Sequence, residues 1–594
     1  MKPAEQWLPD LSRIAVRDGI EVVSSRSGEP TLRVDGVLLH SSYRPSEEAA
    51  RLINSLEIDP ERPVLVVGLG CGYHVQALLR LGFSAYVIEP EPSVAKLCLE
   101  LVPGQSGYLL AVGDPSTLKN DDIWKDLLRR NPQVVVHPPT ERLHPGFAAS
   151  VQSRVSRTRL EGKPLGVAVV GPMQGGSLPI AGYLASAFER LGHRTLYVDT
   201  SSAWPLYDRM TGGVRSRNAS QQLGALFAHV LAEWSYARVA EFAPNICIVL
   251  AQAPVPPAWP LRLAKDNIVT AFWFVENWRH MPYWRQLAPH YDCFFHIQPG
   301  TFERSLTEAG CPHHACVQTA CDPEVHRPVT LSGDERARFA CDLAFAGAGY
   351  FNRNQFFAGL TDYDFAIWGT EWNTRELMPF VRGNNETFTP DQFVRIVAGA
   401  KINLNLHSSS TSTGVDPSCD AVNPRVFEIA ACGGFQLCDP CQGLDRYFEF
   451  ERELPVYRDL RELRAKIDYF INRDDERTAI ARQAREHALR EHTYEHRAKQ
   501  MLECIMDRFA ARIEIKGIRA QRTVAEVAER VGRDSPLGRY LASLPPDTAF
   551  SQESLADCIP QMGSSLTHTE GVFAYLRELR TSSEQLLAMF AGDN

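Results

Sequence analysis

Three stretches of this chain share one pattern, in which a buried apolar run passes into a glycine-rich turn and then into a helix. They begin at residues 63, 166 and 341. Units of this kind assemble into parallel sheets covered by helices, and they bind ligands where the carboxyl ends of the strands meet. The sequence therefore predicts an α/β protein with several Rossmann-like domains.

The length of the chain, 594 residues, is too great for one hydrophobic core. We expect four parts: a β-rich cap with a truncated Rossmann-like domain at 1–160, an α/β domain at 161–335, another at 336–505, and a helical extension at 506–594. The extension is predicted from apolar residues at helical spacing around 524–531 and 572–579. Any homo-oligomer is expected to form through the first or the last part.

The charge balance limits the partners of the protein. Sixty-two basic residues stand against 71 acidic ones, a net charge of −9, which disfavours nucleic acid or an anionic membrane as a partner. No apolar run approaches the roughly 20 residues of a membrane helix, and the first residues lack the apolar core of a signal peptide. We expect a cytoplasmic protein without an integral membrane segment.

The fourteen cysteines lie mostly in apolar periodic segments, which is typical of reduced core residues. Two spacings could suggest a metal, Cys438 with Cys441, and Cys311 with Cys316 and Cys321. Neither has a second pair at zinc-finger spacing. We therefore expect no metal site.

The first glycine turn carries Gly68, Gly70 and Gly72, and Glu89 ends the next strand 19 positions after Gly70. Glycines let the backbone approach a ligand, and a carboxylate at this place can accept hydrogen bonds from a ribose. These four residues are the candidate cofactor site of the N-terminal domain. They resemble the first motif of class I S-adenosylmethionine methyltransferases and the core of MptE-like and Maf-type flagellin-modification proteins.

Only two further strands follow this unit, whereas a methyltransferase sheet has about seven. Two interpretations stay open. The domain binds S-adenosylmethionine or a related cofactor, or it is retained for packing or for binding a partner.

In the second α/β part, Gly175 and Gly176 form the loop after the first strand, and Glu276 directly follows the strand at 268–275. The end of a parallel strand is where a reactive group is mounted. Glu276 is thus a candidate general base and the two glycines are candidate ligand contacts. An ordinary loop carboxylate and an ordinary tight turn are the alternatives.

In the third α/β part, residues 423–437 predict a short helix that Gly433 ends, followed by a strand. Arg425 and Glu428 fall in the first turn of that helix. Free N–H groups at a helix start attract phosphate, and a carboxylate one turn in can accept hydrogen bonds from a ribose diol. The stretch predicts half of a nucleotide-diphosphate site.

The order of motifs from Phe345-Ala-Gly, through Trp368-Gly, to Asn423-Pro-Arg-Val-Phe-Glu resembles the C-terminal half of the CgeB-like glycosyltransferases. These are bacterial enzymes of the GT-B architecture, in which two Rossmann-like domains face a cleft. The resemblance covers roughly 161–505 and is more specific in its second half.

The resemblance implies roles for individual residues. The glutamate at the Glu428 position holds the donor's ribose, and an acid eight positions earlier contacts the donor sugar. Here that acid is Asp420, shorter than the usual glutamate by one methylene, so retaining and inverting outcomes both stay open. Arg353 and Arg425 are candidates for the diphosphate because a guanidinium binds two oxygens at once, with a structural ion pair as the alternative for each. The remaining donor-binding candidates are Asn423, Gly369 and Trp372.

The leading hypothesis is a hexosyltransferase that moves a sugar from a UDP- or GDP-sugar to an acceptor hydroxyl on a protein, such as flagellin, or on a cell-surface glycan. It requires no cofactor or metal, because arginines can carry the charge of the leaving diphosphate. If transfer inverts, Glu276 is the expected base. The alternatives are a bifunctional protein with an active N-terminal methyltransferase and a non-catalytic sugar- or protein-binding scaffold.

Overall fold

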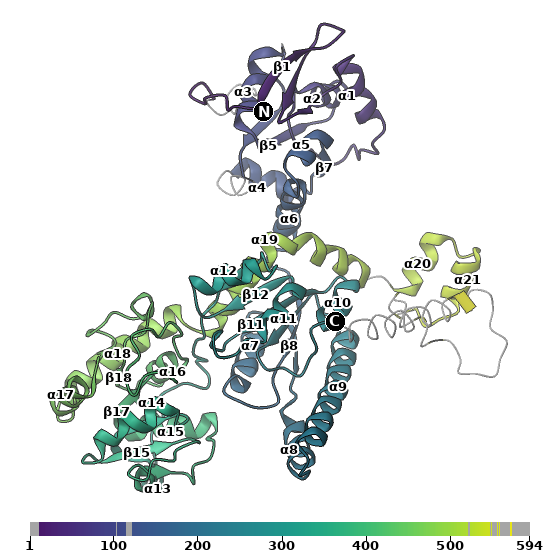
Figure 1. Cartoon of the computed structure of the whole chain (residues 1–594). Coiled ribbons are helices and arrows are strands. Elements are labelled where there is room, and N and C mark those ends of the chain that lie inside the picture. The colour runs from purple at the N-terminus through teal and green to yellow at the C-terminus, as the bar shows by residue number, and fades with distance from the viewer. Residues whose placement is uncertain are drawn as a thin grey trace. The chain divides into compact units, whose positions relative to one another are not determined.

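The computed structural model describes residues 11–102, 104–114, 122–520 and 523–546, with single positions up to Val572. The chain divides into two compact units, one made of Met1–Lys163 with Ile505–Asn594 and the other of Pro164–Cys504 (Figure 1). The boundary at 504 falls within helix α19 (Tyr494–Ala520).

The first unit begins with the predicted β-rich cap, an antiparallel sheet of β1 (Ile20–Ser24), β2 (Pro30–Val34) and β3 (Val37–Leu38). A parallel sheet follows in the order β6-β5-β4-β7, which is the order of the first four strands of a Rossmann fold. Its strands are β4 (Val64–Val67), β5 (Ala85–Glu89), β6 (Leu109–Val112) and β7 (Gln133–Val136). Four strands in the described residues match the truncated sheet expected from the sequence.

Helices cover both faces of this small sheet. They are α1 (Pro45–Asn54), α2 (Tyr73–Arg80), α3 (Pro92–Leu101), α4 (Asp122–Arg129), α5 (Pro138–Leu143) and α6 (Phe147–Leu160). Val64 and Val66 face one cluster, with Val75 of α2, while Leu65 and Val67 face another that includes Val151 of α6. Strand β4 is thus buried on both faces, which explains why it is an unbroken apolar run rather than an alternating one.

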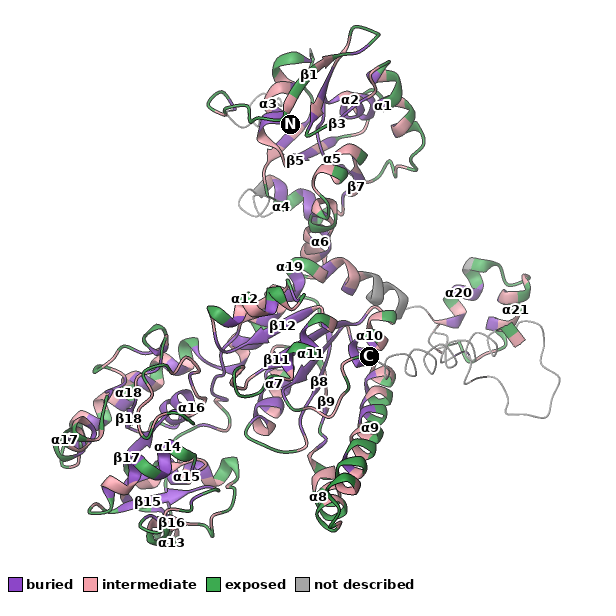
Figure 2. Ribbon diagram, viewed as in Figure 1, coloured by how far each residue is buried: buried purple, intermediate pink, exposed green. Residues whose placement is uncertain are grey.

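The second unit holds two consecutive Rossmann-like domains, the pair expected for the GT-B architecture. The first has a six-stranded parallel sheet in the order β13-β12-β11-β10-β8-β9. Its strands are β8 (Gly166–Val170), β9 (Arg194–Val198), β10 (Ile246–Leu250), β11 (Val269–Phe274), β12 (Cys293–His296) and β13 (His314–Cys316). The main helices around it are α7 (Leu178–Arg190), α8 (Trp204–Gly212), α9 (Arg217–Phe242), α10 (Trp259–Lys265), α11 (Trp284–Leu287) and α12 (Thr301–Glu308). Figure 2 shows the inner strands of this sheet, β8, β10, β11 and β12, as buried.

The second domain has a five-stranded parallel sheet in the order β16-β15-β14-β17-β18. Its strands are β14 (Cys341–Ala346), β15 (Phe365–Trp368), β16 (Val381–Arg382), β17 (Ala400–Asn405) and β18 (Gln436–Cys438). Its helices are α13 (Gly333–Phe339), α14 (Phe351–Phe356), α15 (Pro390–Gly399), α16 (Arg425–Ala431), α17 (Leu460–Phe470) and α18 (Asp474–Glu491). The strand order reverses between β14 and β17, and in open α/β sheets this is the point where ligands bind.

Helix α16 is the short helix that the sequence predicts at 423–437. It begins at Arg425, and Gly433 ends it with a left-handed φ of 75°. Its apolar side packs into a cluster with Leu444 and Phe448, since Val426, Phe427 and Ala430 are fully buried. Arg425 and Glu428 therefore sit on a helix fixed by its own core contacts.

Part of the expected helical extension is described, as α20 (Val524–Val531) and α21 (Pro536–Ala542), which pack together around Val524 and Leu541. The predicted helix around 572–579 lies almost wholly outside the described residues. None of the described helices has the length and apolar character that crossing a bilayer requires. The fourteen cysteines are all free thiols, most of them buried, as the sequence indicates.

Candidate active site

The carboxyl edge of the C-terminal sheet is built around two glycine-containing turns. Gly369, after β15, has a φ of 129°, and a Cβ there would lie 2.2 Å from the carbonyl oxygen of Gly347, after β14. Only glycine lets the two turns approach so closely. Trp372 is 1% exposed, and its indole Nε1 donates to the same Gly347 oxygen at 3.1 Å. Gly369 and Trp372, both predicted as donor contacts, lie where they brace the turn that follows β14.

Arg353 lies on α14, the helix that follows this turn in the chain, and is 8% exposed. Its Nε donates to the Leu406 carbonyl and its Nη1 to the Ala348 carbonyl, both at 2.9 Å. Burial lowers the pKa of Arg353 to about 10, and the nearby charge of Arg425 also acts to lower it. The side chain is still a cation at neutral pH, and it ties the end of β17 to the turn after β14.

Arg425 at the start of α16 is about one-third exposed, and its Nε donates to the Ala346 carbonyl at 3.2 Å. Its guanidinium pairs with the Glu428 carboxylate one turn further on. The guanidinium carbon also lies 4.7 Å from the centre of the Phe393 ring. The cation is therefore held in place by a carbonyl, a carboxylate and an aromatic face.

Glu428 is almost completely buried, and its Oε1 lies 3.9 Å from Nε2 of His326. His326 Nδ1 accepts a hydrogen bond from the Asp322 backbone N–H at 2.9 Å. In the neutral ring the proton is therefore on Nε2, which faces Glu428. The Glu428 carboxylate thus lies between the guanidinium of Arg425, on its own helix, and the imidazole of His326, in the segment before the C-terminal domain.

Asp420 lies in the loop between β17 and α16 and bonds to the N-terminal domain of the same unit. Its carboxylate accepts two hydrogen bonds from Arg279, at 3.0 and 2.8 Å, and one from Gln298 Nε2 at 2.6 Å. Asn423, further along the loop, donates from Nδ2 to Asn405 Oδ1 at 2.8 Å. The loop that leads into α16 is thus fixed at both of these predicted residues.

Glu276 follows β11, as predicted, and is partly buried. Burial raises its pKa to about 7. The pKa of Tyr350, just before α14, is raised mainly by burial; Arg353 and Arg425 act to lower it, and Glu276 acts to raise it. Glu276 thus stands at the carboxyl end of a strand of the N-terminal sheet, with a pKa that suits a general base.

The loop after β8 lies at the corresponding edge of the N-terminal sheet of this unit. Gly175 has a φ of 99°, and a Cβ there would lie 2.8 Å from Gln252 Oε1, whereas Gly176 has open space around it. The backbone N–H of Gln252 donates to the Tyr283 hydroxyl at 3.1 Å, and the pKa of Tyr283 is raised by burial and then by the charge of Glu276. Gln252 thus lies against the glycine loop and is held by Tyr283.

One buried pair, His407 with Asp439, is not among the residues predicted from the sequence. His407 Nδ1 lies 2.7 Å from Asp439 Oδ1, and both side chains are buried. Burial alone would lower the pKa of His407, but the charge and hydrogen bond of Asp439 outweigh it and raise that pKa. Each residue follows a predicted strand, so the positional rule that selected Glu276 could have found both. Gln298, two positions after β12, fits the same rule, whereas Arg279 lies further along the loop after β11.

The candidate cofactor residues of the N-terminal domain face side chains of their own domain. A Cβ on Gly68, Gly70 or Gly72 would lie 2.2 Å from Thr140 Oγ1, 2.8 Å from His40 Nε2 or 2.1 Å from Gln105 Oε1, respectively.

Glu89 is buried in the same domain, and burial raises its pKa to about 7. Its carboxylate accepts hydrogen bonds from the backbone N–H groups of Leu69 at 2.6 Å and Glu91 at 3.0 Å. The carboxylate thus holds the glycine turn.

Residues 353–503 match a family model described as "Glycosyl transferase-like". The match begins at Arg353 and contains Asp420, Arg425 and Glu428. It supports the glycosyltransferase enzyme that the sequence predicts, at the level of this broad family. A search of curated proteins found no match to the chain.

Solved structures of several glycosyltransferases are similar to the chain. Sucrose-phosphate synthase from Thermosynechococcus elongatus is 12% identical, covering 59% of this chain and 99% of its own, with a TM-score of 0.40. A glycosyltransferase from Rickettsia africae is 11% identical over 58% and 99%, with a TM-score of 0.40. HepE from Anabaena, in complex with UDP and glucose, is 12% identical over 57% and 98%, with a TM-score of 0.40. Similarity at this level assigns no function, so the proposal below rests on the matched family and the site residues.

Proposed function

We propose that this protein transfers a glycosyl group from a nucleotide-sugar donor to an acceptor hydroxyl. The observation that carries the proposal is the grouping of Arg353, Arg425 and Glu428 at the carboxyl edge of the C-terminal sheet. Two cations beside a buried carboxylate suit a nucleoside diphosphate, whose phosphates are anionic and whose ribose donates hydrogen bonds.

In this proposal Arg425 binds the diphosphate directly, because its guanidinium is about one-third exposed. Arg353 adds a buried positive charge, and its hydrogen bonds to Ala348 and Leu406 shape the turn beside the phosphates. Glu428 accepts hydrogen bonds from the ribose. Since Arg425 and Glu428 contact each other on one helical turn, they place the phosphates and the ribose of one nucleotide side by side.

In the reaction, the bond from the sugar C1 to the diphosphate oxygen breaks and a bond from C1 to the acceptor oxygen forms. The diphosphate leaves with an added negative charge, which Arg353 and Arg425 stabilise. In an inverting transfer the acceptor proton passes to Glu276, whose pKa of about 7 suits a general base at neutral pH. In a retaining transfer the proton leaves on the diphosphate. In both cases Asp420 accepts a hydrogen bond from the donor sugar.

A thermal-shift panel of UDP, GDP, dTDP, CMP and S-adenosylmethionine tests the proposal. One nucleoside diphosphate is expected to raise the Tm of the wild-type chain, and Glu428→Gln should remove that shift together with transfer activity. Glu486→Gln, an exposed change on α18, is the matched control and should behave like the wild type. A wild-type chain that no diphosphate stabilises at millimolar concentration would contradict the function. Full activity in Glu428→Gln would contradict only this site assignment.

The finer assignments belong to the same proposal. Residues 336–505 bind the donor, a UDP- or GDP-sugar, and residues 161–335 bind the acceptor, a protein such as flagellin or a surface glycan. The CgeB-like motif order in 345–428 supports this division. Incubating the protein with radiolabelled UDP-glucose or GDP-mannose and fractionated bacterial lysate would identify the donor and the class of acceptor. Label that enters neither protein nor glycan fractions would reject these acceptors.

A further inference from the structure

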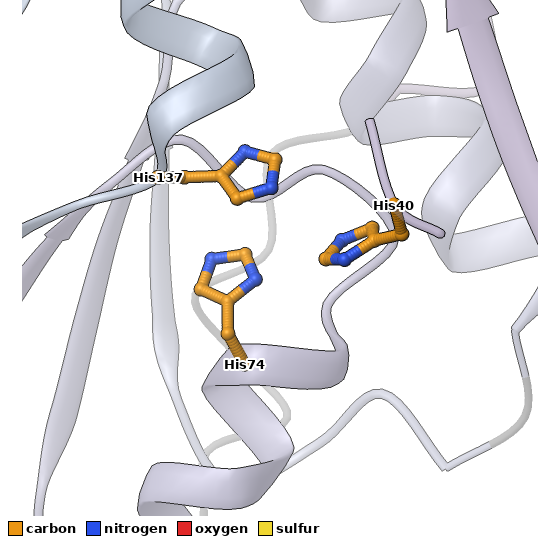
Figure 3. Close-up of side chains that lie close together, drawn as sticks. All are labelled: His40, His74 and His137. Carbon is orange, nitrogen blue, oxygen red and sulfur yellow. The ribbon is translucent and has the colours of Figure 1, made fainter. Parts of the chain in front are cut away.

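Three histidines from separate segments meet inside the N-terminal Rossmann-like domain (Figure 3). His40 follows β3, His74 lies in the first turn of α2, and His137 follows β7. They are 5%, 1% and 3% exposed. The ring centres of His74 and His137 are 4.5 Å apart, and those of His40 and His137 are 4.8 Å apart.

One nitrogen of each ring points to a hydrogen-bond acceptor of the protein. His74 Nε2 lies 2.9 Å from the Gly68 carbonyl, and His137 Nε2 lies 2.9 Å from the Leu39 carbonyl. His40 Nδ1 lies 4.0 Å from a carboxylate oxygen of Glu48. Because a carbonyl only accepts, the Nε2 atoms of His74 and His137 carry the protons, and their Nδ1 atoms present lone pairs.

The opposite nitrogens are the unusual feature of this cluster. Among the described residues, His74 Nδ1 and His40 Nε2 are buried without any hydrogen-bond partner. His137 Nδ1 lies 2.8 Å from the Thr140 hydroxyl. A buried polar nitrogen without a hydrogen-bond partner destabilises the folded state. Two such nitrogens in one cluster therefore indicate that a partner able to accept nitrogen lone pairs is missing. A metal cation is such a partner.

The glycine turn makes room for these rings. A Cβ on Gly70 would lie 2.8 Å from His40 Nε2 and 2.9 Å from His137 Cε1. The turn that could face a nucleotide cofactor in a Rossmann-like domain therefore faces imidazoles here. Two residues of the predicted cofactor site, Gly68 and Gly70, thus belong to the surroundings of the histidine cluster.

We propose that His40, His74 and His137 bind a divalent transition-metal ion of the zinc class. Histidine nitrogens are preferred ligands of such ions, and a metal-bound histidine usually donates its other N–H to a carbonyl or carboxylate. The Gly68 and Leu39 carbonyls have that role here, and the Glu48 carboxylate lies 4.0 Å from His40 Nδ1. One nitrogen of each ring lies within 4.8 Å of the other two. Tetrahedral zinc with bonds of ~2.1 Å separates its ligands by ~3.4 Å, so binding must draw the ligand nitrogens together. It must also rotate the rings of His74 and His137, whose planes are now within 3° of parallel, so that both lone pairs point at the ion.

The ion would join the β cap, through His40, to the Rossmann-like sheet, through His74 and His137. Three protein ligands leave a fourth position for water. The Thr140 hydroxyl, which now donates to His137 Nδ1 at 2.8 Å, would give up that hydrogen bond when the ion binds. Sequence spacing conceals this site, because its ligands come from three distant segments and only the cysteine spacings suggested a metal.

Cobalt titration of the full-length chain, purified without a histidine tag and stripped with a chelator, tests the site. We expect about one Co²⁺ per chain with the visible d–d absorption of a histidine-bound ion, displaced by Zn²⁺. Zn²⁺ should also raise the Tm. His40→Gln and His74→Gln should each weaken Co²⁺ binding at least ~100-fold. His193→Gln, a half-buried histidine outside the cluster, should leave it unchanged.

Two further measurements keep the test decisive if a core variant fails to fold, as judged by circular dichroism. Glu48→Gln removes only the carboxylate beside His40 and should weaken binding about 10-fold. Elemental analysis of the wild-type chain grown with zinc should find about one ion per chain. A folded wild-type chain that holds no metal and gives no cobalt absorption would overturn the proposal, as would undiminished binding in folded His74→Gln.

Discussion

Arg279 and Asp420 form a two-point ion pair, with Nη1 3.0 Å from Oδ1 and Nη2 2.8 Å from Oδ2. Arg279 lies in the loop that follows β11, and Asp420 lies in the loop that leads into α16. The pair therefore joins the two Rossmann-like domains of the second unit. Gln298 adds a third hydrogen bond to the same carboxylate. The acid proposed to contact the donor sugar is therefore oriented by the opposite domain.

Replacing Arg279 with methionine should lower kcat/KM for the donor about 10–100-fold, because Asp420 would lose its orientation. Stability should fall by about 1–3 kcal/mol, because the Asp420 carboxylate is only 12% exposed and would keep only its hydrogen bond from Gln298. Steady-state kinetics and urea unfolding measure the two effects. Arg285→Met, an exposed change on α11, is the control. Unchanged kcat/KM in Arg279→Met would show that the pair has no part in transfer.

Glu276 should impose an acidic limb on the pH profile if transfer inverts. Its pKa is about 7, and a base must be ionised, so kcat/KM should fall as pH drops through about 7 and level off above it. Glu276→Gln should lose most activity at every pH. Glu308→Gln, exposed on α12, should keep the wild-type profile. A wild-type profile that is flat from pH 6 to 8 would exclude Glu276 as the base.

The raised pKa of Glu276 also predicts how the stability of the folded chain changes with pH, whatever the reaction. Burial raises its pKa from 4.5 to about 7, so the folded state holds the proton more tightly than the unfolded state. The wild-type chain should therefore lose stability relative to Glu276→Gln as pH rises from about 4.5 through 7, by up to about 3 kcal/mol. Urea unfolding of both proteins at pH 5 and pH 8 gives the difference, and an equal gap at the two pH values would contradict it.

Local patterns predicted the elements well because each signal acts over a few residues. Gly433 ends α16 with a left-handed φ, as its place after an apolar helical run indicates. The parallel arrangement of the strands also follows, since strands separated by helices form one kind of sheet. The α/β class and the two consecutive Rossmann-like domains are confirmed for this reason.

Partners brought together by packing could not be predicted in this way. Arg279 and Asp420 are 141 positions apart, and nothing in either neighbourhood marks the other. From the sequence, an aromatic residue after a strand can either stack on a ligand or fill the core. Trp372 is buried and hydrogen-bonds to Gly347, and this burial is a property of the assembled domain. His40, His74 and His137 meet for the same reason.

Substitutions of the two arginines of the proposed donor site should differ in their effects on stability and on kcat/KM. Arg353→Met removes the hydrogen bonds to the Leu406 and Ala348 carbonyls and should cost about 2–4 kcal/mol of stability. Arg425→Met removes a third-exposed cation and should cost less stability, yet it should lower kcat/KM for the donor at least ~100-fold. Urea unfolding and kinetics on both variants test this, and the reverse ranking in stability would refute it.

Gly369 should be the most sensitive glycine of the site. A Cβ there would lie 2.2 Å from the Gly347 carbonyl oxygen, and its φ of 129° is itself unfavourable for alanine. Gly369→Ala should therefore cost about 3 kcal/mol or more and should weaken nucleotide binding, because the two turns must separate. Gly383→Ala is the matched control, since it shares a left-handed φ of 77° but its nearest contact, Trp368 Cδ1, is 3.6 Å away. It should cost only about 1–2 kcal/mol. Equal losses in the two variants would mean that backbone conformation alone, and not the close approach of the two turns, requires glycine at position 369.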